Sequence, residues 1–538
     1  MAGELGTGLT LHADAPCHDA PHPDAPLPLA PRTRGARTGE RRAPGRSRRR
    51  AGLGLAGLGI GVVAATTGAG VWALGNVRTN SVGAISTWVG ALVLVVAVLV
   101  ELARKGRHAG WLHPLSLPFA ALAVMSLGAP LWVYFTHEAV GLLYDPGYQP
   151  AAGSTLAVAV SVTCCEALTL VVVGYMAGAA TAVALTKQAG SAAADERSPV
   201  FRYRAMRRAG LALMIAGATS QSAVAVLARG ATYGINQTQY GWASVLGSGA
   251  GTVLLAGLIT VTVTVSHTTS PRRMRDLLHG REWAALCLYA LAVALTGERA
   301  GLIAPIVYLA WAYSTQVRVI PLKWVVAGVL LAVIGGSVIG NYRQDNGLSP
   351  GSANAVLPNA VADISSPAWL TQETVIHVPS TAPYTHGSTY LAAVESQLPG
   401  PAARAVGAPA GTATALFRDI IGFSDPNQGF AESYPSEAYL NFGLAGCLGA
   451  GVFLGALMGW AWRKRPVIAA RPRDLIYPIL LAGLIYGFRS DALTQIKDVL
   501  YPMLLVWGVM GWCRVRSSAA DRVAGAPARG RAPQVTPS

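Results

Sequence analysis

Long apolar stretches alternate with short polar segments along most of the chain. Twelve stretches approach or exceed the ~20 residues that a membrane-spanning helix needs. They lie at residues 51–75, 82–102, 113–135, 152–185, 209–229, 242–266, 282–297, 301–317, 322–340, 438–461, 474–488 and 498–513. The pattern therefore predicts an all-α polytopic membrane protein with about 12 transmembrane helices.

The polar segments divide the chain into five parts. These are a disordered basic cytoplasmic tail at 1–50, transmembrane helices 1–9 at 51–341, a large extracytoplasmic loop at 342–437, transmembrane helices 10–12 at 438–513, and a disordered cytoplasmic tail at 514–538. The large loop is interrupted by Pro and Gly, and it contains an amphipathic piece at 388–398. These features predict short helices lying over the bundle rather than an independent domain.

Composition and charge agree with a membrane protein. Hydrophobic residues make up 52% of the chain and charged residues only 13%. A net charge of +16 would suggest a nucleic-acid partner in a soluble protein, but here Lys and Arg lie between apolar stretches, where they act as topology signals. With the N-terminal tail in the cytoplasm, 34 of the 42 Lys and Arg residues fall inside and 8 outside. This asymmetry predicts the cytoplasmic membrane, both termini inside, the large loop outside, and no nucleic-acid partner.

Several common chemical sites lack their sequence support. The six cysteines do not lie in a large exposed outer loop, so no disulfide framework is expected. The chain has no D-x-D, H-E-x-x-H, G-x-S-x-G or G-x-x-x-x-G-K motif. We therefore expect no metal and no other cofactor. Within the apolar stretches, Glu166 is the clearest charged residue, and a protonated structural role competes there with a proton or ion pathway.

The sharpest change from polar to apolar sequence lies at the end of the large loop. Glu432 and Glu437 stand just before residues 442–458, which contain no charge. A carboxylate so close to hydrocarbon is costly, which favours a functional role. A general base for a sugar hydroxyl could come from any acidic residue expected on the outer side. These are Glu298, Asp345, Glu373, Glu395, Asp419, Asp425, Glu432, Glu437, Asp491 and Asp498. The alternative for Glu432 and Glu437 is that both are solvated loop residues, with Ser433 or Ser436 capping a helix. The sequence does not choose between the two glutamates.

Arginines on the outer side point to an anion. The positive-inside pattern disfavours cations there, yet four arginines are expected at a similar depth. They are Arg299, Arg343, Arg418 and Arg489. The planar guanidinium group offers paired hydrogen bonds to phosphate and stays charged at low dielectric. For each arginine taken alone, the alternative is snorkelling or a carboxylate partner.

Three further residues of the outer side are candidates for contacts with a sugar or headgroup. Asn441 follows Glu437 by four residues, so the two share a face if a helix begins there. His386 and Tyr390 have the same spacing in the sequence THGSTYL. For the histidine, an ordinary surface position is the alternative.

Three patches resemble a known family. They are TGERAGL (296–302), HVPSTAPYTHGSTYLAAVESQLPG (377–400) and GFAESYPSEAYLNFGLAGCLGAGVFLG (429–455). Their order, their spacing and the long outer loop late in the chain resemble the oligosaccharide repeat-unit polymerases, the Wzy-type O-antigen polymerase family. The resemblance covers roughly 290–510. The first eight stretches and the long basic N-terminal tail are not matched residue by residue.

The resemblance implies a GT-C-like, metal-independent membrane glycosyltransferase that uses no cofactor. Its donor and acceptor would be lipid-linked oligosaccharides on polyprenyl diphosphate, and its active site would lie on the extracytoplasmic face. The four outer arginines would hold the diphosphate, Glu432 or Glu437 would act as base, and His386, Tyr390 and Asn441 would contact the sugar or headgroup. The sugar, the linkage and the binding of a chain-length regulator stay open.

Two other functions are compatible with the same sequence. An O-antigen ligase-type glycan transferase would have a similar architecture and a different acceptor. A transporter or flippase for lipid-linked sugars would need no base, but transporters usually carry polar residues near the bilayer midplane, and here most charge lies at the outer surface.

Overall fold

The structure is a computed structural model that describes residues 111–122, 124–126, 155–185, 201–227, 241–268, 273–296, 300–321, 366–397, 412–422, 432–464 and 472–515, together with scattered positions between 271 and 364. All of them belong to the unit that spans Gly54–Ser538. Arg299, Arg343, the stretches expected at 51–75 and 82–102, and the tail at 1–50 lie outside the described residues. The stretches expected at 113–135 and 322–340 are described in part.

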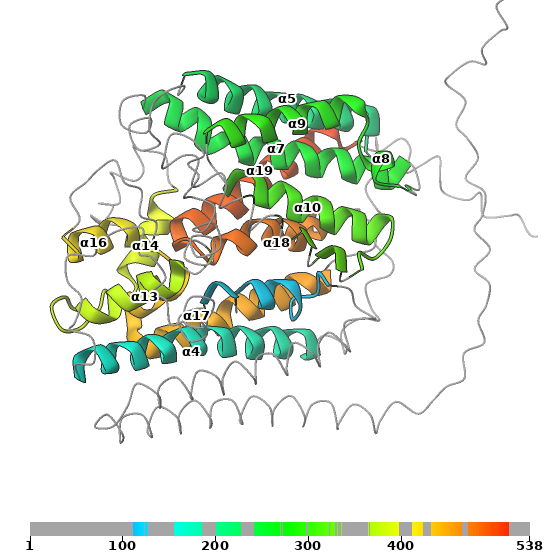
Figure 1. The fold of residues 1–538 in the computed structure, drawn as a ribbon. Coiled ribbons are helices and arrows are strands. Elements are labelled where there is room, and N and C mark those ends of the chain that lie inside the picture. Colours follow the sequence, from blue (N-terminus) through cyan, green and yellow to red (C-terminus); the bar gives the residue numbers. More distant parts are fainter. Residues whose placement is uncertain are drawn as a thin grey trace, which may run out of the picture. The chain divides into compact units, whose positions relative to one another are not determined.

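The described part of the chain is helical and contains no β-strand, as Figure 1 shows. Its helices are α4 (Thr155–Leu185), α5 (Tyr203–Leu227), α7 (Gly241–Thr268), α8 (Met274–Leu277), α9 (Gly280–Thr296), α10 (Ala300–Gln316), α13 (Ser366–His377), α14 (Ser388–Glu395), α16 (Ala413–Ile420), α17 (Tyr434–Lys464), the 3₁₀ helix η1 (Pro472–Leu475), α18 (Ile476–Gly487) and α19 (Ala492–Cys513).

Five of the described helices are long and apolar enough to cross a membrane. The corresponding segments are Glu166–Val183, Tyr203–Leu227, Gly249–Thr268, Tyr434–Trp462 and Ala492–Cys513. A shorter apolar helix covers Ile476–Ile485. The protein is thus an all-α membrane protein.

Glycines let α4 and α17 approach each other closely. Gly451, Gly455 and Gly459 of α17 lie against the backbones of Val171, Tyr175 and Ala179 of α4, in that order. A side chain at any of these glycines would meet a carbonyl oxygen of α4, so only glycine fits. Because residue numbers rise together along the contact, the two helices run in the same direction.

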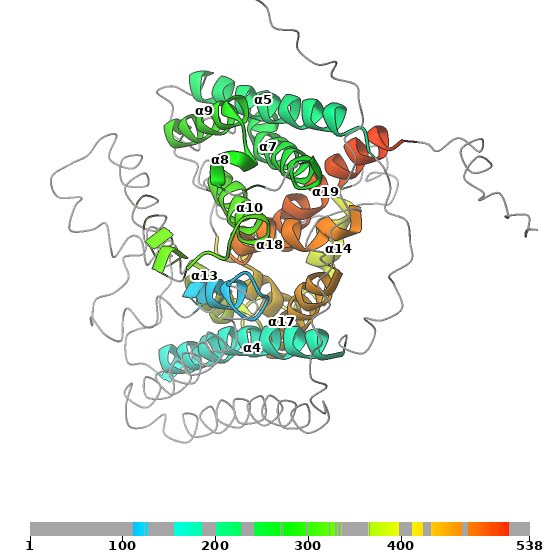
Figure 2. The same ribbon diagram turned by 90° about the vertical axis from the view of Figure 1, so that its right-hand side faces the viewer.

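The remaining long helices form a continuous series of contacts. Helix α17 contacts α18, α18 contacts α10 and α19, α19 contacts α7, and α5 packs on both α7 and α9 (Figures 1 and 2). Helices α5 and α7 are antiparallel, because Gly210 meets Gly257 whereas Gly217 meets Ala250. The backbone N–H of Arg202 donates to Cys513 O over 2.9 Å, which joins the start of α5 to the end of α19.

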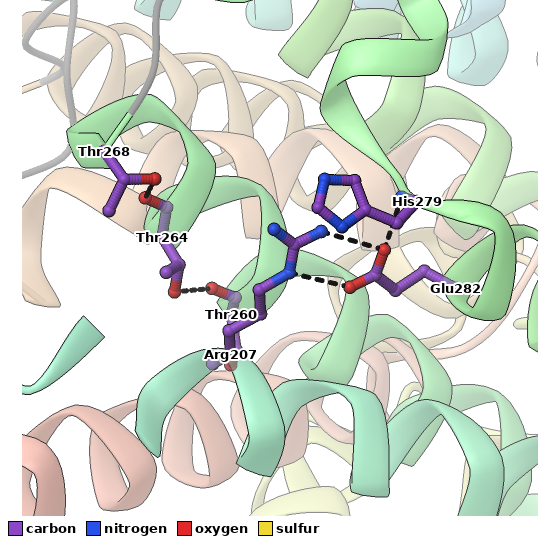
Figure 3. A network of polar contacts seen from close by, with 6 residues as sticks. All are labelled: Arg207, Thr260, Thr264, Thr268, His279 and Glu282. Atoms are coloured by element: carbon purple, nitrogen blue, oxygen red, sulfur yellow. Dashed lines mark hydrogen bonds and ion pairs between the residues drawn. The ribbon is translucent and has the colours of Figure 1, made fainter. Parts of the chain in front are cut away.

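An ion pair fastens α5 to α9. Arg207 forms a forked contact with Glu282, with Nε to Oε1 at 2.9 Å and Nη2 to Oε2 at 3.0 Å (Figure 3). The backbone N–H of His279 also donates to the Glu282 carboxylate. Figure 3 shows beside it the hydroxyls of Thr264 and Thr268, which donate to the carbonyls four residues earlier in α7. The buried side chains of Glu282 and Thr264 are thus satisfied within the bundle.

Short helices from the expected outer loop cover one end of the long helices. Helix α13 packs on α4 and α17, and α14 contacts α16, α17 and α19. The connection between α13 and α14 contains segment 384–387, whose backbone forms hydrogen bonds to α17. This end of the bundle contains the polar groups described next.

Candidate functional site

Helix α17 is broken at Phe442 and Gly443, whose backbone angles are not helical. The hydroxyl of Tyr434 donates to Ala450 O over 2.7 Å. A continuous helix would hold two residues 16 positions apart at about 24 Å. The first half of α17, residues 434–441, therefore folds back along the second half, residues 444–464. Glu437 and the preceding Glu432 lie beside the second half rather than beyond its end.

The break leaves two backbone carbonyls of α17 available as acceptors. A neighbouring segment, residues 384–387, donates hydrogen bonds to both, and we call it the strap. The backbone N–H groups of Thr385 and His386 donate to Leu440 O at 3.0 Å and Asn441 O at 3.1 Å. A Cβ at Gly443, where φ is +62°, would stand 3.0 Å from the Tyr384 hydroxyl. Glycine is therefore required both by the backbone conformation and by the close approach of the strap.

Asn441 fastens the strap to α17. Its Oδ1 accepts from the Thr385 hydroxyl at 2.7 Å and from the Gly387 N–H at 2.8 Å. Its Nδ2 donates to the Thr389 hydroxyl at 2.6 Å and to Glu437 O at 2.8 Å. Both amide hydrogens and both lone pairs are thus used within the protein, so Asn441 is placed as a structural connection beside Glu437.

Glu437 is fully buried and fully engaged. Its Oε1 accepts from the Thr389 hydroxyl at 2.8 Å, and its Oε2 accepts from the Ala492 N–H at 2.6 Å. Ala492 is the first residue of α19, where unpaired N–H groups and the helix dipole favour a negative group. The carboxyl of Glu437 therefore links α14, α17 and α19.

Glu432 is also fully buried, but neither of its carboxyl oxygens has a hydrogen-bond partner. Burial raises the pKa of Glu432 well above the ordinary carboxyl value, and the nearby Glu437 and Asp491 raise it further, against opposing contributions from the Ser436 side chain and the Ser433 backbone. The Ser436 hydroxyl itself donates to Leu370 O at 3.0 Å, so it does not satisfy the Glu432 oxygens. Glu432 is the member of the pair that keeps its acceptor capacity for something else.

Asp491 completes a carboxyl cluster, defined as Glu432, Glu437 and Asp491. It is 2% exposed and caps α19, with Oδ1 accepting from the Thr494 N–H at 3.0 Å. Its Oδ2 accepts from the Thr414 hydroxyl at 2.8 Å, and that hydroxyl accepts from the Glu432 N–H at 3.1 Å. The sequence offered Asp491 only as one of ten acidic residues expected on the outer side, and Thr414 was not predicted. The pattern Asp491-x-x-Thr494 signals a helix cap, but nothing local in the sequence points to Thr414.

Burial contradicts the alternative that Glu432 and Glu437 are solvated loop residues, since both side chains are 0% exposed. The capping role does hold: Ser433 accepts from the Ser436 N–H at 3.4 Å. A capped helix start and two buried carboxyls therefore coexist in one segment.

Two of the four predicted arginines lie on segments that carry or contact members of the carboxyl cluster. Arg418 is half-buried in the last turn of α16, four residues after Thr414 and hence on the same helix face. Arg489 is half-buried in the turn between α18 and α19, two residues before Asp491.

His386, in the strap, and Tyr390, just after it on α14, differ in their surroundings. Tyr390 on α14 is half-buried; burial raises its pKa, and the nearby Glu437 contributes in the same direction. His386 is exposed, and its backbone has a φ of +49°. Tyr390 therefore lies near the carboxyl cluster, whereas the His386 side chain faces outward from the strap.

Among the described residues, no group of three or more His, Cys, Asp or Glu side chains is arranged to hold a metal ion. The chain matches no family model, no curated protein and no solved structure in the comparisons made.

Proposed function

We propose that this protein is a membrane glycosyltransferase that polymerises polyprenyl-diphosphate-linked oligosaccharide repeat units into a surface polysaccharide or exopolysaccharide. The reaction would take place at the outer face of the cytoplasmic membrane. The observation that carries the proposal is the buried, unpartnered carboxyl of Glu432, in a segment that resembles those polymerases.

Helix direction supports the expected orientation. The count of Lys and Arg requires the stretches 152–185 and 438–461 to cross the membrane in the same direction. Helices α4 and α17 pack in parallel along their glycine contact. With this orientation the carboxyl cluster belongs to the outer half of the protein, next to the short helices from the large loop.

In the proposed reaction, Glu432 is the general base. A hydroxyl of the incoming repeat unit attacks the anomeric carbon of the growing glycan, the bond from that carbon to the diphosphate oxygen breaks, and the hydroxyl proton passes to Glu432. Glu437 is a weaker candidate, because both of its oxygens already accept hydrogen bonds. A buried base without competing partners is suited to a proton transfer from which water is excluded.

The leaving polyprenyl diphosphate has two phosphate groups to be held, and a further negative charge develops on the oxygen released from the anomeric carbon. Arg418 lies one helical turn after Thr414 on α16, and Arg489 lies two residues before Asp491 in the turn before α19. A guanidinium group matches phosphate oxygens with paired hydrogen bonds, so we assign these two arginines to the diphosphate, together with Arg299 and Arg343 from the sequence pattern. Tyr390, near Glu437, is assigned to the sugar or headgroup.

The test is chain extension by purified protein in liposomes that contain only lipid-linked repeat units. We expect longer glycans and released polyprenyl diphosphate with no nucleotide and with a chelator present. Because the base must lose its proton before it can accept another, the rate should rise with pH through the raised pKa of Glu432. A lasting need for a divalent ion, or wild-type turnover in Glu432→Gln, would exclude the mechanism.

A transporter for lipid-linked sugars is the second candidate, because broken helices such as α17 form substrate sites in transporters. The same liposomes separate the two functions. A transporter would move the lipid-linked unit across the bilayer and leave glycan length unchanged. An O-antigen ligase-type transferase would move finished chains to another acceptor without lengthening them.

A further inference from the structure

The Thr414 side chain forms hydrogen bonds both to the backbone of Glu432 and to Asp491. Its hydroxyl donates to Asp491 Oδ2 at 2.8 Å and accepts from the Glu432 backbone N–H at 3.1 Å. A hydroxyl has one hydrogen and two lone pairs, so one side chain performs both roles with fixed directions. Three segments far apart in sequence meet at this single oxygen.

The two carboxyl oxygens of Glu432 accept no hydrogen bond, although the Ser436 side chain and the Ser433 backbone lie close enough to lower its pKa in part. Its position therefore depends on its backbone, and the backbone N–H is held by Thr414. Asp491 is fixed independently, because its Oδ1 accepts from both the N–H and the hydroxyl of Thr494. Asp491, fixed at the start of α19, thus holds the Thr414 side chain, and Thr414 in turn holds the backbone of Glu432.

We propose that Thr414 is a positioning residue that holds the Glu432 carboxyl in place and at a set distance from Asp491. The inference rests on the proposed function only in taking Glu432 as the base. Thr414 touches no reacting atom and acts through the residues on either side of it. It also stands one helical turn from Arg418, so the helix assigned to diphosphate binding is the one that holds the base.

The charges around Glu432 determine in which direction the loss of the Thr414 hydroxyl should shift the pKa of Glu432. Glu437 of α17 and Asp491 at α19 face Glu432, Tyr390 of α14 lies near Glu437, and Arg418 occupies the Thr414 face of α16. The hydroxyl of Thr414 offsets part of the Asp491 charge. Removing that hydroxyl leaves the charge less compensated, so Glu432 should release its proton at a higher pH.

The experiment follows the protonation of Glu432 directly, in full-length protein reconstituted in lipid. Infrared difference spectra report the C=O band of a protonated buried carboxyl, and the loss of that band in Glu432→Gln assigns it. We expect Thr414→Val to raise the titration midpoint by about one pH unit. Thr414→Ser, which keeps the hydroxyl, should titrate like the wild type.

The matched control is Thr412→Val on the same helix. Thr412 caps α16 by accepting from the Ala415 N–H at 3.4 Å, and among the described residues it forms no hydrogen bond with the carboxyl cluster. It should leave the midpoint unchanged. If Thr414→Val does not fold, Thr414→Ala, which adds no bulk, takes its place in the titration.

The results separate this inference from the proposed function. An unchanged midpoint in Thr414→Val and Thr414→Ala would overturn the inference, and so would equal shifts in Thr414→Ser and Thr414→Val. A shifted midpoint in a protein that never extends a glycan would support the positioning role and reject the polymerase. In an active protein, the rising limb of the pH–rate profile should move with the infrared midpoint.

Discussion

The backbone N–H of Ala492 donates to the carboxylate of Glu437 over 2.6 Å, and this bond ties the first turn of α19 to the folded-back half of α17. Glu432, five residues earlier, has no equivalent bond. The two glutamates that the sequence could not separate therefore differ in what a substitution would remove.

Replacing each glutamate with glutamine should give opposite outcomes. Glu437→Gln should lose about 1–3 kcal/mol of stability. Glutamine replaces one carboxyl oxygen with an amide nitrogen that cannot accept a hydrogen bond, so either the Thr389 hydroxyl or the Ala492 N–H loses its acceptor. Glu432→Gln breaks no bond and removes a carboxyl whose pKa is raised by burial, so it should stay within ~0.5 kcal/mol of wild type at pH 4.5 and be the more stable of the two at higher pH, yet abolish chain extension. Thermal unfolding and glycan length are measured on both variants. Equal stability losses would show that Glu432 has a structural partner.

The stability of the protein should depend on pH through Glu373 of α13. This side chain is 1% exposed, its Oε1 has no partner, and burial raises its pKa from 4.5 to about 7. The contribution of protonated Glu373 to the free energy of unfolding is fully present below pH 4.5, and it is lost as the pH rises through 7. Glu373→Gln should therefore gain on the order of 1–2 kcal/mol over wild type at pH 8, and nothing at pH 4.5.

Denaturation curves at the two pH values measure this gain. The control is Gln372→Asn on the same helix, which alters no ionisable group, so its difference from wild type should be the same at both. A constant difference for Glu373→Gln as well would show that Glu373 has the same pKa in the folded and unfolded states.

The glycine contact between α4 and α17 should tolerate no side chain. Gly455→Leu would drive a side chain into the backbone of Tyr175 and should cost about 3 kcal/mol or more, or prevent folding. Gly449→Leu is the control, because a Cβ there meets nothing within 4 Å. Yield and thermal unfolding in detergent report the difference. If the two variants behave alike, the helices do not pack through this seam.

Arg418 should not be replaceable by lysine if it grips a diphosphate. Lysine keeps the charge but loses the planar fork, so we expect Arg418→Lys to reduce chain extension about tenfold or more without unfolding the protein. Arg204→Lys, at an exposed position of α5, is the matched control. Full activity in Arg418→Lys would remove this residue from the site.

Apolar length and charge were enough to predict helices where the structure has them: the stretch expected at 242–266 corresponds to α7 and that at 474–488 to α18. Hydropathy cannot reveal a change of direction inside an apolar segment. The expected span at 438–461 is a helix that starts at Tyr434 and turns back at Phe442 and Gly443. That difference decides where Glu432 and Glu437 lie.

The site could be predicted only as far as its local spacing. Glu437 and Asn441 share a helix face, as a spacing of four residues predicts. The hydroxyls that surround the carboxyl cluster come from Thr389 and Thr414, at distances along the chain that no local pattern spans. Their contribution depends on tertiary packing of short helices from the large loop.

The two halves of α17 differ in mechanical freedom. Residues 444–464 are locked to α4 by backbone contacts through Gly451, Gly455 and Gly459, which leave no room to slide. Residues 434–441 are held by hydrogen bonds and by the close approach of Ala438 O to Gly446. We expect any widening of the site to rotate the first half about Phe442 and Gly443. A pair of probes at Tyr434 and Ala450, which touch in the closed arrangement, would measure that motion directly.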